Sequence, residues 1–250
     1  MLDLTPLSFG VIFMALALGG VLKGATGMGV PIIAVPVIAA FFDVRLAVAL
    51  VAVPNLFTNA WQLWRFRQEL LPGAFTWALS AASAVGVVAG TVLLATLPAE
   101  GLMLLVAVAV TGYVGLRVSV PQFRLTLDAA RRMSAPVGVV AGLLQGAAGI
   151  SAPVSVSFLN ALRLARPAFI ATISAVFATM SVTQLPALAT AGVLTAQVFI
   201  LGLMALLPIL AFMPVGAWLA RRLSARGFDL VVLVFLSLLA LKLYYDALMA

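Results

Sequence analysis

The sequence contains no cysteine and no histidine, and only 8% of its 250 residues are charged. Without cysteine it has no disulfide and no thiolate metal site. Without histidine it lacks the commonest general base and the commonest metal ligand. Acidic residues number only seven. We therefore expect no bound metal and no cofactor, and we expect the protein not to be an enzyme, since few groups for catalysis remain.

Apolar residues, by contrast, make up 65% of the chain, whereas soluble domains contain about 45–50%. They form long continuous blocks, which indicate transmembrane helices and exclude the alternating pattern of a porin-like barrel. The sequence therefore predicts an all-α polytopic membrane protein. The net charge of +7 is explained by basic cytoplasmic loops, so we expect contact with the lipid bilayer and none with nucleic acid.

Charges and prolines divide the chain into ten apolar segments, arranged as two similar series of five. Each series begins with two short segments and continues with three that are long enough to cross a membrane, which takes about 20 residues. A polar stretch separates them, so we predict a first transmembrane repeat (1–118), a cytoplasmic linker (119–134) and a second repeat (135–250). The segments are 6–22, 30–42, 44–64, 73–97 and 101–118, then 135–148, 152–162, 166–185, 192–219 and 228–248.

A glycine-rich stretch joins the two short segments in each series. Such a pair is typical of a broken or re-entrant helical hairpin, in which the chain enters the membrane and returns. The alternative is two short ordinary helices with a turn between them. Recurrence at corresponding places in both halves favours the hairpin.

The repeat is visible residue by residue. Residues 19–31, GGVLKGATGMGVP, align with residues 141–153, AGLLQGAAGISAP, at an offset of 122. The same offset places Asn59 on Ser181 and Gln62 on Gln184. Further along, an offset of 126 places Gly90 on Gly216. We interpret the chain as an internal duplication.

Basic residues give the expected sidedness. If the loops alternate between the two sides of the membrane, one side collects eleven arginines and the other only Arg45 and Lys242. Lys23, at the tip of the first hairpin, is left aside. By the positive-inside rule the arginine-rich side is cytoplasmic and both termini are non-cytoplasmic. Each half then has an odd number of crossings, so the repeats are inverted, as in many secondary transporters. The eleven are Arg65, Arg67, Arg117, Arg124, Arg131, Arg132, Arg163, Arg166, Arg221, Arg222 and Arg226.

These motifs resemble the TauE/SafE family of sulfite exporters over almost the whole chain. The resemblance rests on GVLKGATGMGVPIIAVPVIAAFF, RLAVALVAVPNLFTNAWQLWRFR and GVVAGTVLLATLP in the first half. In the second half it rests on GLLQGAAGISAPV and PVGAWLARRLSARGFDLVVLVFLSLLALKLY. It implies a bacterial inner-membrane transporter for small anions such as sulfite, sulfoacetate and other organosulfonates. The sequence has GATGMG where the family's first hairpin is often denser in glycine.

Lys23 is the main candidate for holding an anion. It is the only basic residue outside the predicted loops and helix ends, and a charge at membrane depth usually marks function. The next short helix, expected to begin near residues 28–29, would present free N–H groups and a positive dipole end. The alternative places Lys23 at the cytoplasmic surface. The candidate residues of this hairpin are Lys23, Gly24, Thr26, Gly27 and Gly29.

The second hairpin offers neutral candidates at the equivalent place, Gln145, Gly149 and Ser151. Their amide, backbone and hydroxyl groups suit the oxygens of a sulfonate or a carboxylate. Close helix packing through small residues explains them equally well.

Polar stripes on two of the long segments complete the candidate site. Asn55, Asn59 and Gln62 share one helical face, and Ser181 and Gln184 lie on the matching face of the second half. Amides in an apolar helix need partners, so these faces should point at each other or at a wet cavity. The alternative is that they only join helices through hydrogen bonds.

The predicted function is that of a secondary transporter, with an anion channel or uniporter for another small carboxylate or inorganic anion as the alternative. A protein-borne proton relay is hard to build, because the acids all map to termini, loops or helix ends. Transport would then be driven by the membrane potential or by a proton carried on the substrate, with sodium ions as a third option. A homodimer is one arrangement open to such a chain. The acids are Asp3, Asp43, Glu69, Glu100, Asp128, Asp229 and Asp246.

Overall fold

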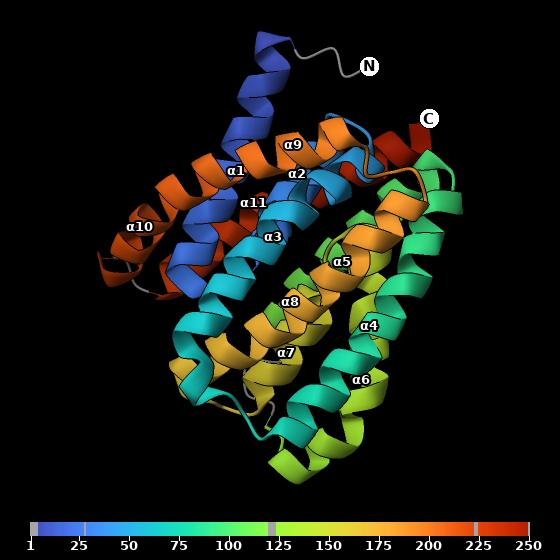
Figure 1. The fold of residues 1–250 in the computed structure, drawn as a ribbon. Coiled ribbons are helices and arrows are strands. Elements are labelled where there is room, and N and C mark those ends of the chain that lie inside the picture. The colour runs from blue at the N-terminus through green and yellow to red at the C-terminus, as the bar shows by residue number, and fades with distance from the viewer. Residues whose placement is uncertain (1–4, 28, 120–123, 223–224, 250) are drawn as a thin grey trace.

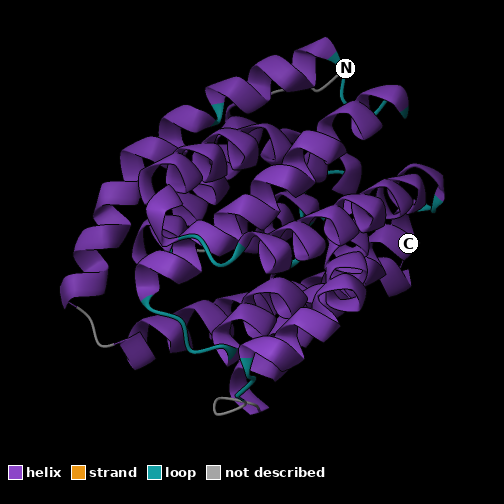
Figure 2. Ribbon diagram, turned by 60° about the horizontal axis from the view of Figure 1, so that its bottom comes forward, coloured by secondary structure: helices purple, strands orange, loops and turns teal. Residues whose placement is uncertain are grey.

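The protein is seen in a computed structural model that describes residues 5–27, 29–119, 124–222 and 225–249, excluding the side chains of 225–229. The described residues form helices joined by short loops, with no strand among them (Figures 1 and 2). The predicted all-α class is therefore confirmed. The first half contains α1 (Pro6–Thr26), α2 (Pro31–Ala39), α3 (Val44–Phe66), a 3₁₀ turn η1 (Arg67–Glu69), α4 (Gly73–Thr96) and α5 (Ala99–Ser119). The second contains α6 (Leu127–Ala148), α7 (Ala152–Ala161), α8 (Arg166–Thr190), α9 (Ala196–Met204), α10 (Leu206–Arg222) and α11 (Ala225–Met249).

Helix lengths support a multi-pass membrane protein. Seven stretches of the described chain are long and apolar enough to cross a bilayer. Helices α1 and α6, at 21 and 22 residues, are longer than predicted. Thr126 accepts a hydrogen bond from the backbone N–H of Ala129 and so caps α6, which starts inside the stretch interpreted as a linker. Asp3 and the side chains of Arg226 and Asp229 lie outside the described part.

Only the second helix of each pair is short. Helices α2 and α7 have 9 and 10 residues, which gives lengths of about 14 and 15 Å. A bilayer core of about 30 Å is twice as thick, so neither helix crosses a membrane alone. This length favours the broken hairpin over a pair of ordinary spanning helices.

Left-handed glycines terminate the helices that precede α2 and α7. Gly27 has φ 76° and Gly149 has φ 68°, a conformation that side-chain-bearing residues rarely adopt. Their N–H groups donate to the carbonyl oxygens of Lys23 and Gln145, respectively, and so close the last turns. Proline cannot continue a preceding helix but suits the first turn of a new one, and α2 starts at Pro31. Met28, near which α2 was expected to begin, lies outside the described residues.

Two pairs of helices pack at very short range through glycine. Helix α1 packs against α10, and α4 packs against α6. A Cβ atom on Gly142 would overlap the Ser83 carbonyl oxygen, and one on Gly90 would overlap that of Leu143. Gly86, four residues before Gly90 in a GxxxG pattern, makes the same kind of contact with the Val139 carbonyl oxygen. The missing Cβ atoms let the two backbones touch, which is a common basis of helix association in membranes.

A break at Ala205 separates α9 from α10. Pro208 cannot donate to the carbonyl of Met204, and its ring would clash with that carbonyl in a continuous helix. The chain therefore turns one residue after Met204. Before the break, α9 contacts α3. In the first half the corresponding helix is α4, which has no proline and packs against α8 without a break. Pro208 thus interrupts the helical segment between Met204 and Leu206.

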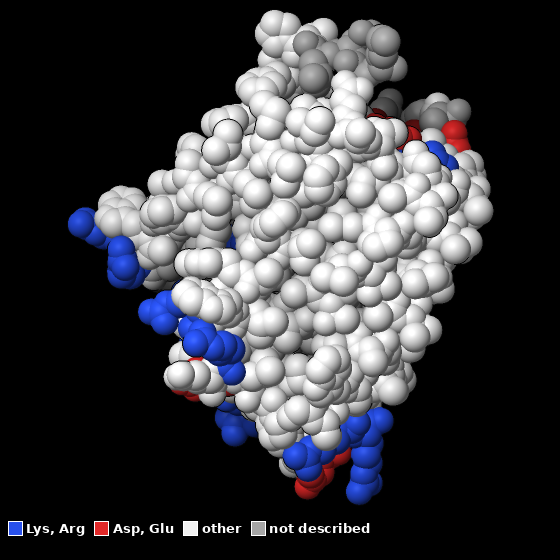
Figure 3. Space-filling model, in the orientation of Figure 1, with Lys and Arg blue, Asp and Glu red and all other residues white. Residues whose placement is uncertain are grey.

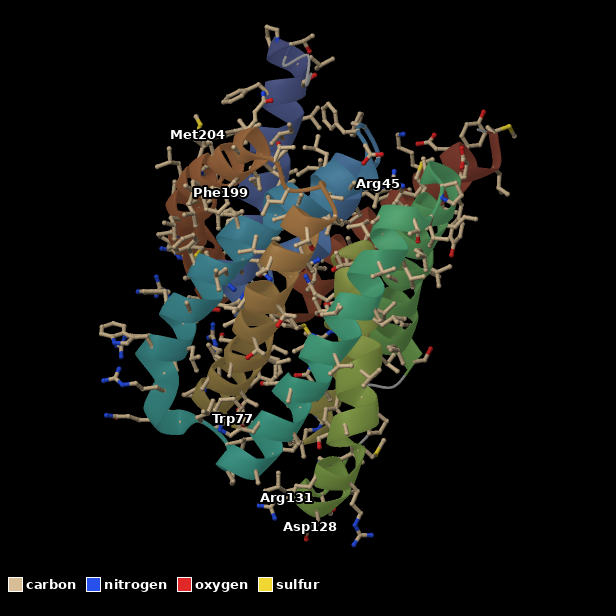
Figure 4. The ribbon with its side chains drawn as sticks, turned by 45° about the vertical axis from the view of Figure 1, so that its right-hand side comes forward. Arg45, Trp77, Asp128, Arg131, Phe199 and Met204 are labelled. Carbon is tan, nitrogen blue, oxygen red and sulfur yellow. The ribbon has the colours of Figure 1, made fainter. Side chains whose placement is uncertain are left out.

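The charged residues on the surface seen in Figure 3 lie toward the two ends of the molecule, with an uncharged band between them. Lys and Arg side chains gather along the left and lower edges in Figure 3. Asp128 and Arg131 lie at the lower end in Figure 4, whereas Arg45 lies at the end that also holds the termini in Figure 1. Large exposed apolar side chains, including Val85, Val92 and Leu238, cover the outside of the helices. This distribution fits a protein surrounded by lipid.

Candidate functional site

Where the two hairpins meet, the molecule has a small central cavity in which three polar side chains lie among apolar residues and glycine. Its walls come from the start of α2, the start of α7, and two helices that cross beside them, α3 and α8. Its volume is about 10 Å³, room for about one water molecule. A group larger than a water molecule fits there only when these segments separate. The lining residues are Gly29, Pro31, Ile32, Asn55, Gln145, Ile150, Ser151, Ala152 and Phe177.

Both hairpins turn the N-terminal ends of their short helices toward this cavity. Gly29 and Pro31 precede and begin α2, while Ser151 and Ala152 precede and begin α7. The N–H groups of a first helical turn lack partners within the helix and favour negative charge. The cavity therefore combines two helix starts with the side chains of Asn55, Gln145 and Ser151.

A chain of hydrogen bonds connects Lys23 to the cavity. The Nζ of Lys23 donates to Oδ1 of Asn59 at 2.9 Å, and Nδ2 of Asn59 donates to Oδ1 of Asn55 at 2.8 Å. Nδ2 of Asn55 then donates to Oγ of Ser181 at 3.2 Å. The chain runs from α1 through α3 to α8, so the polar faces of α3 and α8 point at each other, as expected.

A second network lies on the other side of the cavity. Nε2 of Gln145 donates to Oε1 of Gln184 at 3.2 Å, and Nε2 of Gln184 donates back to the Gln145 carbonyl at 3.0 Å. Ser151 donates to Oε1 of Gln145 at 3.0 Å. On the face shared by α3 and α8, Ser174 donates to Oε1 of Gln62 at 3.3 Å. Each amide thus joins helices, and Gln145 also lines the cavity.

Lys23 is the only charged residue that is buried among those described. Its exposed fraction is 0%, so the interpretation that placed it at the surface is wrong. Among the described residues, no carboxylate forms an ion pair with it. Burying an unpaired charge is costly, and the last turn of α1, where Lys23 lies, lowers that cost because helix C-termini favour cations.

A larger pocket, here called the vestibule, lies beside Lys23. It has a volume of about 660 Å³ and lies between α1, α3, α8 and α10. Lys23 lies in its floor, and the exposed Arg166 lies in its wall. The break at Ala205 leaves room for it, because α10 turns away from α3 there. The lining residues are Lys23, Gly24, Gly27, Phe57, Thr58, Trp61, Gln62, Phe66, Arg166, Ile170, Leu206, Leu210, Met213, Pro214 and Ala217.

The structure divides the thirteen candidate residues into four groups. Gly29, Asn55, Gln145 and Ser151 line the cavity, and Lys23, Gly24, Gly27 and Gln62 line the vestibule. Asn59, Ser181 and Gln184 hold lining side chains by hydrogen bonds. Thr26 donates to the Leu22 carbonyl, and Gly149 forms the left-handed turn.

Arg166 was missed as a site residue. Sequence reasoning counted it only as a sidedness signal, whereas its Nη2 donates to the Ala25 carbonyl at 3.2 Å near the end of α1. In the sequence, only its position just before Pro167, at the start of a long helix, indicates that Arg166 lies near a helix end. No sequence pattern indicates that α10 forms an apolar wall of the vestibule, since that wall depends on the break at Ala205.

Comparison with known protein families identifies the family to which this helical membrane protein belongs. Residues 12–243 match the model of the family described as sulfite exporter TauE/SafE. The chain belongs to that family. Comparisons with curated proteins and with solved structures each gave no significant match. As a TauE/SafE member, the chain is a multi-pass membrane protein of a family of anion exporters, and the resemblance seen in the sequence is confirmed.

Proposed function

We propose that this TauE/SafE protein is a secondary transporter that exports a small anion, either sulfite or an organosulfonate such as sulfoacetate. The anion binds in the central cavity, near the midplane, where the starts of α2 and α7 meet. The observation that carries the proposal is a fully buried Lys23 linked to that cavity through Asn59 and Asn55. Helix starts at broken segments are the usual anion sites of secondary transporters.

Glycine contacts support the proposal that the two halves are inverted repeats. Gly20 meets the backbone of Ile209, and its counterpart at offset 122, Gly142, meets Ser83, the counterpart of Ile209 at offset 126. Helix contacts follow the same exchange, since α1 packs against α10 as α6 packs against α4. Contacts that repeat on exchanging the halves are those of a pseudo-twofold axis. The repeats would span 1–118 and 135–250, on either side of the linker.

A second set of glycines obeys the same exchange. Gly24 meets Met213, and its counterpart Gly146 meets Val87, the counterpart of Met213. Ten apolar segments and an odd number of crossings in each half then produce the inverted topology.

We propose further that the protein resides in a bacterial inner membrane with both termini outside the cytoplasm. The arginine-rich end would face inward by the positive-inside rule. The vestibule lies next to that end, because Arg166 and Phe66 line it and Phe66 adjoins Arg65 and Arg67. An anion from the cytoplasm would therefore reach the vestibule first. The lipid bilayer and the anion are the partners that this arrangement requires.

The closed centre favours a carrier over a channel. A cavity of about 10 Å³ offers no continuous path for an ion through the described residues. A vestibule on one side and hydrogen-bonded amides on the other are the features of an alternating-access transporter that is open to one side. The anion would be driven outward by an inside-negative potential or would carry its own proton.

Counterflow in proteoliposomes tests the proposed function. Vesicles loaded with unlabelled sulfite should accumulate labelled sulfite transiently, with saturable uptake, because a carrier exchanges bound substrate faster than it returns empty. Uptake should not require sodium ions at a clamped pH gradient. Failure to exchange sulfite or any organosulfonate would contradict the proposal, and unsaturable flux would assign the protein to the channels.

A vestibule that opens only toward the arginine-rich end predicts which engineered thiols can be labelled from that side. Trp61 lines the vestibule, and its counterpart at offset 122 is Thr183. Because the chain has no cysteine, the single variants Trp61→Cys and Thr183→Cys each present one thiol. We expect an impermeant maleimide added from the arginine-rich side to modify Trp61→Cys at least about ten times faster, since the thiol must be reached by water. Equal rates would contradict a one-sided vestibule.

A further inference from the structure

We propose that the central site accepts anions with a single negative charge and rejects dianions. Bisulfite and simple sulfonates would bind, whereas sulfate, the sulfite dianion and a doubly charged organosulfonate such as sulfoacetate would bind poorly. The inference rests on the proposed function and narrows it, because it specifies the charge of the substrate and so removes sulfoacetate from the organosulfonates proposed above. The reason is the number of full charges that the site contains.

Lys23 can supply at most one positive charge, and no other charged group is buried with it in the described part of the chain. The cavity is lined only by neutral groups, the side chains of Asn55, Gln145 and Ser151 being the polar ones. A singly charged anion in the cavity, linked to Lys23 through Asn55 and Asn59, makes the centre electrically neutral. A dianion would leave one buried negative charge without a partner, which is the costly state.

Arg166 does not alter this balance. It is the other charged residue that lines the vestibule, but it is exposed. Water and salt screen the interaction of such a charge with one in the interior. From α1, Lys23 faces the start of α8 and the neutral residues Met213 and Ala217 of α10, and it donates to Asn59 of α3. The elements around Lys23 thus add no second buried charge.

Helix dipoles do not supply the missing charge either. The starts of α2 and α7 each carry a partial positive charge of about one half. The ends of α1 and α6 carry partial negative charges of the same size, and each lies in the same hairpin, since α1 ends at Thr26 and α2 begins at Pro31. The two ends of each break therefore nearly cancel in net charge. The helix starts orient the anion, while Lys23 balances its charge.

Equilibrium binding to the purified full-length protein in detergent tests the charge rule directly. Methanesulfonate and sulfate are tetrahedral and similar in size, but they carry one and two charges. We expect sulfate to bind at least about 100-fold more weakly, because an unpaired buried charge costs several kcal/mol. Sulfite loses its last proton near neutral pH. Its binding affinity should therefore fall relative to that of methanesulfonate as the pH rises. The ratio to methanesulfonate removes any effect of pH on the protein.

A gain-of-function variant provides an independent test. Gln145 is the counterpart of Lys23 in the second half and lines the central cavity. The variant Gln145→Lys adds a second buried charge, so it should bind sulfate more tightly than the wild type, by at least about tenfold, and should favour it over methanesulfonate. Gln145→Met is the matched control, since it removes the same hydrogen bonds without adding charge, and it should not gain sulfate binding.

The outcomes separate this inference from the proposed function. Sulfate or sulfite dianion bound as tightly as methanesulfonate would overturn the charge rule and leave anion transport standing. Binding of none of the three anions would overturn the proposed function itself. If Gln145→Lys fails to fold, the wild-type comparison of methanesulfonate, sulfate and sulfite still decides the charge rule.

Discussion

Replacing Lys23 with glutamine is expected to weaken sulfite or methanesulfonate binding by at least about 100-fold and to abolish counterflow. Truncating one partner of a buried charge pair costs about 2–5 kcal/mol, and Lys23 is the only charge near the cavity that is buried in the described chain. The measurement is equilibrium binding to purified Lys23→Gln, followed by counterflow in proteoliposomes.

Thermal stability distinguishes a binding role from a structural one. Without anion, Lys23 is a buried ammonium with no carboxylate partner in the described chain, so Lys23→Gln should keep or raise the Tm. The matched control is Lys242→Gln, because Lys242 is the only other lysine. Lys242 donates to the Ala40 carbonyl at 2.6 Å and pairs with Asp246, and its loss should leave affinity unchanged. Wild-type affinity in Lys23→Gln would contradict the proposed site.

Replacing Gly142 with alanine is expected to prevent correct assembly or to destabilise the protein by about 3 kcal/mol or more. The added Cβ would overlap the carbonyl oxygen of Ser83, and a rigid backbone atom cannot move aside as a flexible side chain can. Overpacking of a tight contact costs about 1–3 kcal/mol even without backbone overlap. The measurements are the yield of monodisperse protein in detergent and its Tm.

The duplication adds a second prediction at the equivalent position. Gly20→Ala should have a comparable effect, because its Cβ would meet the backbone of Ile209. Gly112→Ala is the control, since no atom lies within 4 Å of the added Cβ, and alanine favours the helix by about 1 kcal/mol over glycine. A wild-type Tm in Gly142→Ala would contradict the close contact of α4 and α6.

The sequence predicts much of the site because its polar residues are few and regularly placed. Lys23 stands out as a basic residue away from the predicted loops, and an apolar chain has few ways to hide a charge. The i, i+4, i+7 spacing of Asn55, Asn59 and Gln62 puts their side chains on one face of α3. The offset of the repeat identifies the matching face of α8, which includes Ser181, and the structure shows that Asn55 donates to Ser181.

The remaining features depend on tertiary structure, which local patterns do not encode. The ends of α1 and α6 extend past the predicted segments because a capping residue or a left-handed glycine, and not hydropathy, determines where a helix starts or stops. The vestibule exists because α10 turns away from α3 at Ala205, and prolines in the segment predict a kink but not its direction. Arg166 joins the site through its hydrogen bond to the Ala25 carbonyl of α1, a tertiary contact.

Crystals or cryo-EM samples prepared with 2-bromoethanesulfonate, a singly charged organosulfonate, test the central claim most directly, since the bromine can be located independently of the protein. The account predicts anion density in the central cavity, with the sulfonate between the starts of α2 and α7 and within hydrogen-bonding distance of Lys23 or its partner Asn59. Density confined to the rim of the vestibule beside Arg166, with an empty centre and an unchanged Lys23–Asn59 contact, would contradict it.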